Sequence, residues 1–252
     1  MSGKILIETE NLTKIYNGRT AVDRLSFHLL EGEVFGFLGP NGAGKTTTLL
    51  MLLGLTEPTE GWVKVLGLDP SRNPIAVKSQ IGHLQENMGF YGDLNAWQML
   101  DFIAELNGIP DDSARERCEK ALRAVGLLDE AEKSIRTFSR GMRQRLGIAE
   151  LLIKECRIAF MDEPTLGLDP DATNRMMDLV EQLCLETNMT VLLSSHLLHL
   201  VQRICHRVGI MIRGKMVACG PVEQLAREKL GIDNDAYTLE QVYMKYFEEG
   251  RP

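Results

Sequence analysis

The chain has 252 residues, of which 44% are hydrophobic and 25% are charged. Those proportions are ordinary for a soluble globular protein of one or two domains, and they exclude a disordered, collagen-like or disulfide-scaffold protein. Asp and Glu outnumber Lys and Arg by 35 to 28, a formal net charge of −7. The chain therefore lacks the general basic field that drives non-specific binding to nucleic acids.

Cysteine usage and the first residues both predict a cytoplasmic protein. The five cysteines include no C-x-x-C pair, and this scattered, odd set favours buried thiols in a reducing compartment. No run reaches about 18 consecutive apolar residues, the length that spans a bilayer. The N-terminus has one lysine followed by acids and no long apolar stretch, unlike a secretory signal.

Short apolar segments alternate with loops through the first part of the chain. Val34–Leu38 is nearly all apolar and runs into Gly39-Pro40, which predicts a buried strand that feeds a loop. Between residues 25 and 29, apolar and polar residues alternate as in a half-buried strand. The other elements predicted here are a short strand at 5–7, a helix at 46–55 ending at Gly54, and a short strand at 62–66.

The pattern becomes helical between about 95 and 155. An example is the stripe of Met142, Leu146, Ala149 and Ile153. Further on, 158–161 and 190–193 are candidate buried strands, separated by a helix at about 171–186. Strand, helix and strand at this spacing predict a parallel α/β sheet, so we expect the helical block to be inserted into an α/β core.

Residues 39–46 match a phosphate-binding loop. Gly39-Pro-Asn-Gly-Ala-Gly-Lys-Thr46 fits the pattern G-x-x-x-x-G-K-[ST], after a predicted strand and before a predicted helix. The glycines allow successive backbone N–H groups to turn toward one anion, and the positive end of the following helix adds to the attraction. In such a loop Lys45 reaches the β- and γ-phosphates, and the hydroxyl of Thr46 binds Mg²⁺.

Two acids follow the apolar segment at 158–161. Asp162 and Glu163 are expected at the carboxyl edge of the sheet, where α/β proteins bind their ligands. Mg²⁺ prefers hard oxygen ligands, so Asp162 is expected at the metal, directly or through water. Phosphoryl transfer to water needs an aligned nucleophile, so Glu163 is expected to polarise the attacking water as general base.

From about residue 4 to 220 the chain resembles the nucleotide-binding domain of ATP-binding cassette (ABC) proteins. The motifs that carry the resemblance stand in the family's order. They are the phosphate loop, the signature-like Phe138-Ser-Arg-Gly-Met-Arg-Gln-Arg-Leu146, Asp162-Glu163-Pro164-Thr165, the D-loop Gly167-Leu168-Asp169, and the switch segment Ser194-Ser195-His196. The resemblance implies an α/β P-loop NTPase with a RecA-like parallel-sheet core, a small antiparallel β subdomain and an inserted α-helical subdomain.

The same resemblance implies a division of the chain. The ABC ATPase domain is expected at 1–220, with its α/β core at about 1–86 and 157–220 and its helical subdomain at about 87–156. A short C-terminal helical tail is expected at 221–252, where apolar residues at helical spacing predict packing of a terminal helix. A short tail of this kind resembles exporter-type cassettes, such as those for drugs, antibiotics or lipids.

Carried over residue by residue, the resemblance implies two half-sites. The expected ATP-binding residues are an adenine-stacking aromatic and the phosphate loop, namely Tyr16, Gly39, Pro40, Asn41, Gly42, Ala43, Gly44, Lys45, Thr46 and Thr47. The signature would act in trans, on the nucleotide of the opposite subunit, through Ser139, Arg140, Gly141 and Met142. Ser139 also stands where a helix N-cap would. Arg140 and Met142 depart from the family's usual Gly and Gln.

Catalysis is expected from Glu163, His196 and Lys45. His196 would hydrogen-bond the γ-phosphate and the water held by Glu163, and Asp169 belongs to the D-loop. The metal ligands are expected to be Thr46, Asp162 and either Gln85 or Glu86. In the alignment Glu86 occupies the family's usual glutamine position, and either residue can serve.

The resemblance further implies ATP and Mg²⁺ as cofactors and two kinds of partner. One is a second ABC ATPase subunit, in a homodimer or a heterodimer, and the other is a separate transmembrane permease. The chain is expected to be cytoplasmic and peripheral, on the inner face of the cell membrane via the permease. The stretch from Asn87 to Asn95 resembles the face that grips this membrane partner. No nucleic-acid partner is expected.

The predicted function is therefore an ATP-binding and ATP-hydrolysing subunit of an ABC transporter, which energises transport through ATP-driven dimer closure. One alternative is a soluble ABC-type ATPase in DNA repair or translation. That class usually has a long coiled-coil insertion or two cassettes in one chain, and the sequence has neither. Another alternative is a non-catalytic regulatory ATP-binding module, suggested by the departures at Arg140 and Met142.

Overall fold

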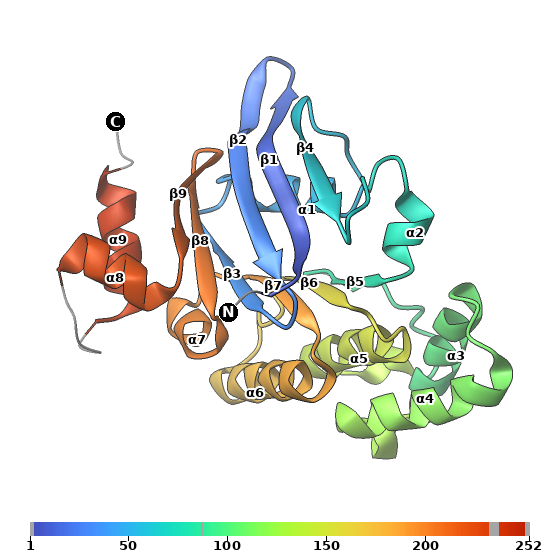
Figure 1. Ribbon diagram of the computed structural model, residues 1–252. Coiled ribbons are helices and arrows are strands. Elements are labelled where there is room, and N and C mark those ends of the chain that lie inside the picture. The colour runs from blue at the N-terminus through green and yellow to red at the C-terminus, as the bar shows by residue number, and fades with distance from the viewer. Residues whose placement is uncertain (1–2, 87, 232–236, 250–252) are drawn as a thin grey trace.

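The computed structural model describes residues 3–86, 88–231 and 237–249 (Figure 1). Its strands form two sheets. The antiparallel sheet has the order β2-β1-β4, with β1 at Ile5–Tyr16, β2 at Arg19–Leu30 and β4 at Glu60–Val65. The larger sheet has the order β5-β6-β7-β3-β8-β9. Its strands are β3 Val34–Leu38, β5 Ile81–Leu84, β6 Ile158–Asp162, β7 Thr190–Ser194, β8 Arg207–Ile212 and β9 Lys215–Gly220.

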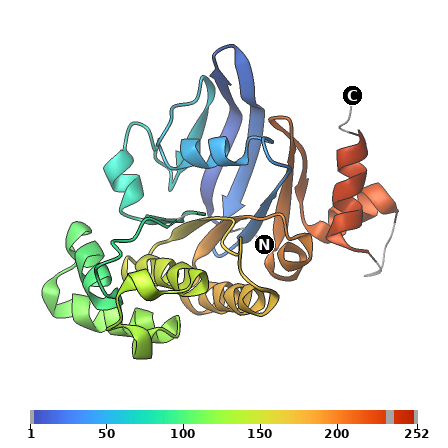
Figure 2. The ribbon, with the colours of Figure 1, turned by 180° about the vertical axis from the view of Figure 1, so that it is seen from behind.

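The helices lie on both faces and at the ends of the larger sheet (Figures 1 and 2). They are α1 Lys45–Leu52, α2 Pro74–Lys78, α3 Ala96–Leu106, α4 Asp111–Ala124, α5 Arg140–Ile153, α6 Pro170–Thr187, α7 Leu198–Ile204, α8 Val222–Leu230 and α9 Leu239–Glu249. Two short 3₁₀ turns stand at Leu128–Glu130 and Ile135–Thr137. In Figure 1 α5, α6 and α7 lie below the sheet, and α1 lies above it beside the antiparallel sheet.

The centre of the larger sheet is parallel, as the sequence predicts. Strands β5, β6, β7, β3 and β8 run parallel, and β9 returns antiparallel beside β8. Strand β3 matches its predicted span, and β6 and β7 each extend one residue beyond theirs. The interior residues of β3, β6 and β7 are buried and mostly apolar because both faces of these strands are covered. The expected fold class, an α/β P-loop NTPase, is confirmed.

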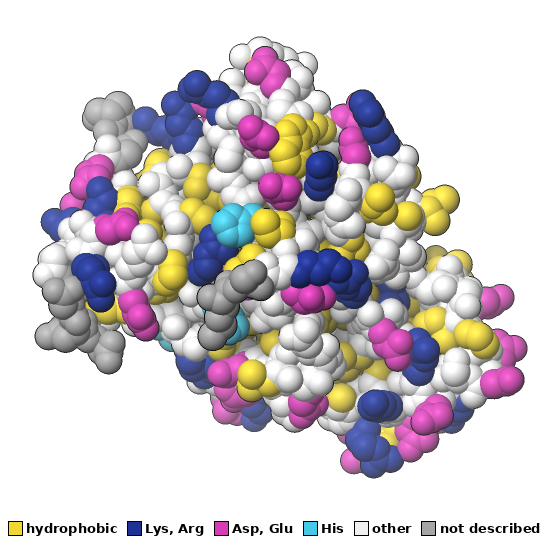
Figure 3. Space-filling model, viewed as in Figure 1, with side chains coloured by type: hydrophobic (Ala, Val, Ile, Leu, Met, Phe, Trp, Pro, Cys, Tyr) yellow, Lys and Arg dark blue, Asp and Glu magenta, His cyan; other side chains and the backbone are white. Residues whose placement is uncertain are grey.

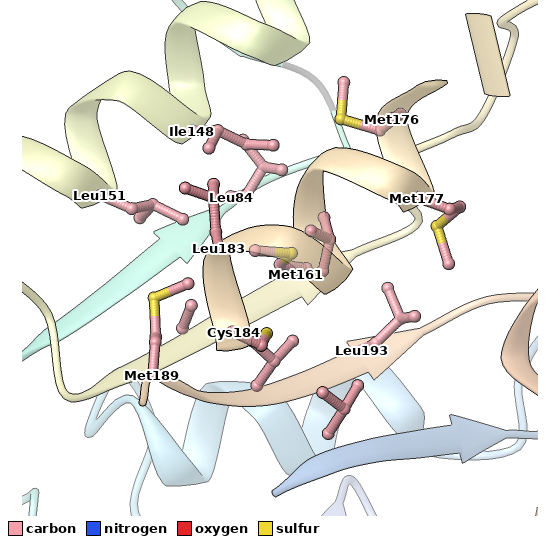
Figure 4. Close-up of a cluster of buried hydrophobic side chains, with 14 of the residues drawn as sticks. Leu84, Ile148, Leu151, Met161, Met176, Met177, Leu183, Cys184, Met189 and Leu193 are labelled. Carbon is pink, nitrogen blue, oxygen red and sulfur yellow. The ribbon is translucent and has the colours of Figure 1, made fainter. Parts of the chain in front are cut away.

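Alternate residues of the strands in the larger sheet point to its two faces and pack into two separate hydrophobic cores. Phe35 and Phe37 of β3 stack on Phe27 of the antiparallel sheet, with ring centroids 5.7 and 5.8 Å from it. On the opposite face, Met161 of β6 and Leu193 of β7 pack against α5 and α6. Figure 4 shows side chains from both strands and both helices meeting in this second core.

The antiparallel sheet is longer than expected. The sequence predicts strands only at 5–7 and 25–29, whereas β1 and β2 each have 12 residues. Much of β1 exposes polar side chains, so its apolar alternation is visible over only part of its length. Asn17 and Gly18 connect the two strands with φ angles of 48° and 78°, which suits a tight hairpin turn.

Helix limits also differ by a few residues from the predicted ones. Helix α1 begins at Lys45 and ends at Leu52, not at 46 and 55, because Gly54 takes a left-handed φ of 64° and closes the helix. Helix α6 spans one residue more at each end than predicted. Helices α3, α4 and α5 fall within the predicted helical subdomain, and α8 and α9 within the predicted tail. The domain boundaries themselves stay predictions.

The five cysteines are free thiols, and four of them are buried. Burial raises the pKa of Cys156 to about 11 and that of Cys184 to about 12. A thiol with so high a pKa stays protonated and unreactive at neutral pH. The prediction of buried, inert thiols therefore agrees with the structure for these residues.

Candidate functional site: a phosphate loop, an acidic sheet edge and a separate capped helix

The phosphate loop connects β3 to α1 and requires glycine at two positions. Gly39 and Gly44 have φ angles of 154° and 104°. A Cβ at Gly39 would lie 2.4 Å from the carbonyl oxygen of Met211, and one at Gly44 would lie 2.5 Å from that of Ala21. Only glycine accommodates both the conformation and the close backbone approach, so the loop's shape follows from its sequence.

Lys45 is buried at the first position of α1. Its Nζ donates a hydrogen bond to the carbonyl oxygen of Gly39 at 2.7 Å and lies 3.4 Å from that of Pro40. Burial lowers its pKa, while the negative charges of Glu163 and Asp162 oppose that shift. The ammonium group is therefore within electrostatic reach of both acids, at the position where the sequence predicts a phosphate-binding lysine.

The loop opens on a cavity of about 690 Å³, here called the phosphate-loop cavity. Its lining residues are Arg19, Thr20, Ala21, Asn41, Gly42, Ala43, Gly44, Lys45, Thr46, Thr47, Arg213 and Gly214. Arg19 and Arg213 are cationic side chains that the sequence analysis does not single out. Together with Lys45 and the loop amides they give the cavity a strongly anion-attracting lining.

Asp162, Glu163 and the switch segment meet at the carboxyl edge of the larger sheet. Strand register places Asp162 beside Ser194, and Ser194 beside Phe37 of β3. The hydroxyl of Ser194 donates to Oδ1 of Asp162 at 2.5 Å, and the backbone N–H of Glu163 donates to the carbonyl oxygen of Ser194 at 3.1 Å. The phosphate loop, the two acids and the switch segment thus follow three neighbouring parallel strands, β3, β6 and β7, and lie at the same edge of the larger sheet.

Glu163 and His196 are in direct contact. Oε2 of Glu163 lies 2.8 Å from Nδ1 of His196, and the backbone N–H of His196 lies 3.4 Å from the same oxygen. Glu163 has a φ of 48°, which is uncommon for a residue with a side chain. Such a conformation persists where the surrounding structure holds it, and it is found often at functional sites.

A second cavity, of about 520 Å³, lies between these groups and is here called the Glu163 cavity. It is lined by Gly39, Pro40, Asn41, Glu86, Glu163, Leu166, Ser195, His196, Leu198 and Tyr243. It therefore joins the phosphate loop, the acid, the switch histidine and the C-terminal helix. For this part of the tail, which contains Tyr243, the sequence predicts only the packing of a terminal helix.

Of Gln85 and Glu86, only Glu86 lines the Glu163 cavity. Gln85 is exposed, whereas Glu86 is half-buried. The backbone carbonyl oxygen of Glu86 accepts a hydrogen bond from Nε2 of Gln144 at 3.4 Å, which ties this segment to α5. Asn87, where the predicted membrane-partner segment begins, lies outside the described residues.

Ser139 caps α5, as the sequence predicts. Its hydroxyl accepts a hydrogen bond from the backbone N–H of Met142 at 3.2 Å. A third cavity, of about 540 Å³, lies at this helix end and is here called the Ser139 cavity. It is lined by Ser139, Arg140, Gly141, Met142, Arg145, Gly167, Leu168, Asp169, Ala172, Arg175 and Met176. It shares no lining residue with the other two cavities.

The D-loop lies beside the signature residues of its own chain. Asp169 caps α6, and its Oδ1 accepts from the backbone N–H of Ala172 at 2.9 Å. That hydrogen bond lowers the pKa of the Asp169 carboxyl. The side chain of Arg140 lies against Gly167, where an added Cβ would be 2.5 Å from its Nη1. The departure at Arg140 thus brings a cation onto the D-loop.

Comparison with known proteins identifies the family. The family model described as ABC transporter matches residues 22–166. The chain belongs to the ABC transporter family. It is 39% identical to the bacitracin transport ATP-binding protein BcrA of Bacillus licheniformis, over 88% of this chain and 72% of that one. It is 38% identical to the linearmycin resistance ATP-binding protein LnrL of Bacillus subtilis, over 90% and 73%.

Solved structures of ABC subunits have the same fold. A structure of an ATP-binding subunit of an ABC transporter superposes with a TM-score of 0.85 at 27% identity, covering 96% of this chain and 99% of that one. The cbiO1 structure from Clostridium perfringens superposes with a TM-score of 0.82 at 25% identity, over 98% and 97%. The chain is thus an ABC transporter ATP-binding subunit, and its family implies hydrolysis of ATP. No helix among the described residues is long and apolar enough to cross a membrane.

Tyr16, the expected adenine-stacking aromatic of this ABC subunit, lies at the tip of the β1–β2 hairpin. It is half-exposed, and Nζ of Lys14 lies 5.0 Å from its ring centroid. Arg19, its partner across the hairpin, lines the phosphate-loop cavity, whereas Tyr16 is not among the lining residues. Its role in stacking stays a prediction.

The sequence does not indicate that His83 of β5 lies near Asp162. Burial lowers the pKa of this histidine, and the nearby charge of Asp162 opposes the shift. His83 pairs in register with Phe160, two residues before Asp162 on the neighbouring strand β6. Nothing local in the sequence signals this proximity, since the two residues are brought together only by strand order.

Proposed function

We propose that this chain is the Mg²⁺-dependent ATPase subunit of an exporter-type ABC transporter, working as one of two cassettes that close on ATP. The contact that carries the proposal is the pair Glu163 and His196, joined at 2.8 Å beside the phosphate loop. A carboxylate and an imidazole that line one cavity together with phosphate-loop residues are groups able to align and deprotonate a water molecule.

ATP would place its phosphates in the phosphate-loop cavity. The backbone N–H groups of the loop and the N-terminus of α1 attract the phosphate oxygens. The Nζ of Lys45 now donates to backbone carbonyls, and a phosphate oxygen would be a stronger, charged acceptor for it. Binding would therefore exchange neutral hydrogen bonds of Lys45 for charge-assisted ones.

The donors at the sheet edge suit Mg²⁺. Thr46 is exposed in the phosphate-loop cavity, and Asp162 is half-buried with one oxygen fixed by the Ser194 hydroxyl. Mg²⁺ takes hard oxygen ligands and usually binds one or two carboxylates together with substrate phosphates. When bound, the ion would neutralise charge on the phosphates. Thr46 and Asp162 would hold it, and Glu86 is the nearer candidate of the two remaining residues because it lines the Glu163 cavity.

Hydrolysis would use Glu163 as the base. Its carboxylate would accept a proton from a water in the Glu163 cavity as the water oxygen attacks the γ-phosphorus, and ADP would leave. In the free chain His196 occupies Oε2 of Glu163. A γ-phosphate offers His196 an alternative, more highly charged acceptor, which frees that oxygen for the water. The switch histidine thus links the arrival of ATP to exposure of the base.

A second cassette would complete each site. Ser139 and the N-terminus of α5 form an anion-attracting end, and this Ser139 cavity shares no lining residue with the phosphate-loop cavity of the same chain. The two anion-attracting ends are thus separate features of one chain, and a nucleotide at the interface of two chains would contact the phosphate loop of one and the Ser139 end of the other. A head-to-tail pair, homodimer or heterodimer, satisfies this arrangement with two ATP molecules at the seam.

A separate transmembrane permease would convert the closure of this pair into transport. The relatives' names refer to bacitracin transport and linearmycin resistance, which favours an antibiotic-like or drug-like substrate moved outward. The chain would then lie on the inner face of the membrane, held by its permease. The substrate is selected by that other polypeptide.

The test is phosphate release by the purified chain with ATP, in Mg²⁺ and in EDTA. We expect turnover in Mg²⁺ and its loss in EDTA, with restoration when Mg²⁺ is added back. Thr46→Ala and Asp162→Asn should each raise the Mg²⁺ concentration needed for half-maximal rate. Turnover that is equally fast in EDTA would contradict the proposal.

A further inference from the structure

The C-terminal helix α9 contributes a side chain to the Glu163 cavity. Tyr243 lines this cavity together with Leu166, His196 and Leu198. It is half-buried, and its ring stacks on that of Phe247 one turn later, with centroids 6.0 Å apart and planes 13° apart. In Figure 1 α8 and α9 lie beyond the β9 edge of the larger sheet. The C-terminal tail thus reaches the proposed hydrolysis site of its own chain, although Tyr243 is far from Glu163 in the sequence.

Helix α9 is attached to α7, the helix that follows the switch histidine directly. Gln202 of α7 holds the start of α9 at two points: its Oε1 accepts from the backbone N–H of Leu239 at 2.7 Å, and its Nε2 lies 3.4 Å from the carbonyl oxygen of Tyr237. Thr238 and Gln241 then cap α9 reciprocally through their side chains. The first turn of α9 is therefore fixed relative to α7.

Apolar packing fixes the rest of α9. Leu239 and Val242 are fully buried, and Tyr246 is nearly so, all within the core that also contains Leu200 and Val201 of α7. Lys229 of α8 covers the Tyr246 ring at 4.6 Å and forms an ion pair with Glu249. Because α9 is held on several sides, Tyr243 has a rigid support from which to act on its neighbours.

One neighbour of Tyr243 in the cavity is His196, which exchanges its hydrogen-bond partner in the proposed mechanism. Leu198 begins α7, and only Leu197 separates it from His196. Burial raises the pKa of the Tyr243 hydroxyl, in keeping with its half-buried place beside these residues. By contrast Met244, the next residue, is 43% exposed on the helix surface. Only one of these two adjacent side chains lines the cavity.

We propose that Tyr243 is a positioning residue for ATP hydrolysis: its ring, supported by α9 and the Gln202 attachment, packs on the start of α7 and sets the position of His196. The proposal rests on the proposed ATPase function of the Glu163 cavity. It assigns the tail a part in the turnover step rather than in nucleotide binding, because none of the tail residues that the structure describes lines the phosphate-loop cavity.

The experiment compares Tyr243→Ala, Tyr243→Phe and the matched control Met244→Ala in steady-state ATPase assays. We expect Tyr243→Ala to lower kcat roughly tenfold while KM for ATP changes less than about twofold. Tyr243→Phe should retain the wild-type rate, since the ring is kept, and Met244→Ala should be unaffected. Gln202→Ala, which removes the attachment without touching the cavity, should lower kcat in the same way. A wild-type kcat in Tyr243→Ala, or equal loss in all three tail variants, overturns the proposal.

A double-mutant cycle separates positioning from general destabilisation. If Tyr243 acts through His196, its substitution should have little further effect in a His196→Ala background, whereas independent defects multiply. Hydrogen exchange of the 195–204 segment should be several-fold faster in Tyr243→Ala than in Met244→Ala. This readout needs no turnover: it tests the tail contact even if the wild-type chain proves not to hydrolyse ATP. Unchanged exchange would contradict the contact, and multiplicative rate losses would contradict action through His196.

Discussion

His196 and Glu163 hold each other in the nucleotide-free chain, with Nδ1 of the histidine 2.8 Å from Oε2 of the carboxylate. The Glu163 side chain is only 14% exposed, whereas that of His196 is 54% exposed. The base is thus enclosed and the histidine remains accessible from the cavity. A group that competes for His196 can therefore uncover Glu163 without moving the strand that carries it.

Replacing His196 tests this exchange. We expect His196→Ala to lower kcat by about 10²-fold or more, because a positioned proton-handling group contributes on that order, with ATP affinity nearly unchanged. His199→Ala is the matched control, since His199 is an exposed histidine at the second position of α7, three residues after His196. Steady-state kinetics and titration with a fluorescent ATP analogue supply the two readouts. Equal rates for His196→Ala and His199→Ala would remove the histidine from the mechanism.

Replacing Lys45 should weaken ATP binding more than it destabilises the fold. Lys45→Ala removes the buried ammonium that faces Asp162 and Glu163, so we expect ATP affinity to fall roughly tenfold or more. The control Lys64→Ala removes an exposed cation that lies over Trp62, 4.9 Å from its ring centroid. Isothermal titration with ATP measures both variants. An affinity for ATP equal to that of the wild type would contradict the phosphate-loop assignment.

Mixing two inactive chains tests whether a site is shared between subunits. Lys45→Ala breaks the phosphate loop and Ser139→Ala breaks the signature, so each homodimer has no intact site. A mixed dimer has one intact site, formed by the loop of one chain and the signature of the other. We expect the mixture to recover up to roughly one quarter of the wild-type ATPase rate. If mixing adds nothing while both variants remain folded, the sites are not composite.

Glu150 on α5 gives the chain a pH-dependent stability. Burial raises the pKa of its carboxyl to about 7, Lys154 opposes the shift, and Oε1 has no hydrogen-bond partner among the described residues. A raised pKa means that the folded chain binds this proton more tightly than the unfolded chain does. Between the unfolded pKa near 4.5 and about 7, this residue therefore lowers the free energy of unfolding as pH rises.

Glu150→Gln removes that titration. We expect the variant to be more stable than the wild type at pH 8, by about 1–3 kcal/mol, and to gain little at pH 4.5. Urea unfolding followed by circular dichroism at the two pH values measures the difference. A gain of the same size at both pH values would show that the carboxyl group is not buried as described.

The sequence predicts an element most accurately where a local apolar pattern and a turn or capping residue mark the same limit. Val34–Leu38 is all apolar and ends at Gly39-Pro40, so both limits of β3 are visible. The cap at Ser139 is likewise predicted from its place before a helical stripe, and the structure confirms it. The long strand β1 is not visible at full length, because its exposed face carries polar residues and its apolar alternation is interrupted.

Relationships between distant segments are the part that the sequence does not reveal. Tyr243 reaches the Glu163 cavity only because α9 docks on α7, and His83 approaches Asp162 only because β5 pairs with β6. Neither contact leaves a periodicity or a spacing in the chain. The same holds for the two arginines of the phosphate-loop cavity, which come from a hairpin and from the β8–β9 turn.

Over the face shown in Figure 3, acidic and basic side chains are interspersed.

The most direct measurement is the mass of the Glu163→Gln variant in solution, by light scattering after size exclusion, with and without Mg²⁺ and ATP. Removing the base should stop turnover while both anion-binding ends remain intact. We expect a monomer without nucleotide and a stable dimer of two chains with two bound ATP molecules. If saturating ATP leaves Glu163→Gln monomeric, pairing of two copies of this chain is contradicted, and if the variant hydrolyses ATP at the wild-type rate, the assignment of Glu163 as the base is contradicted.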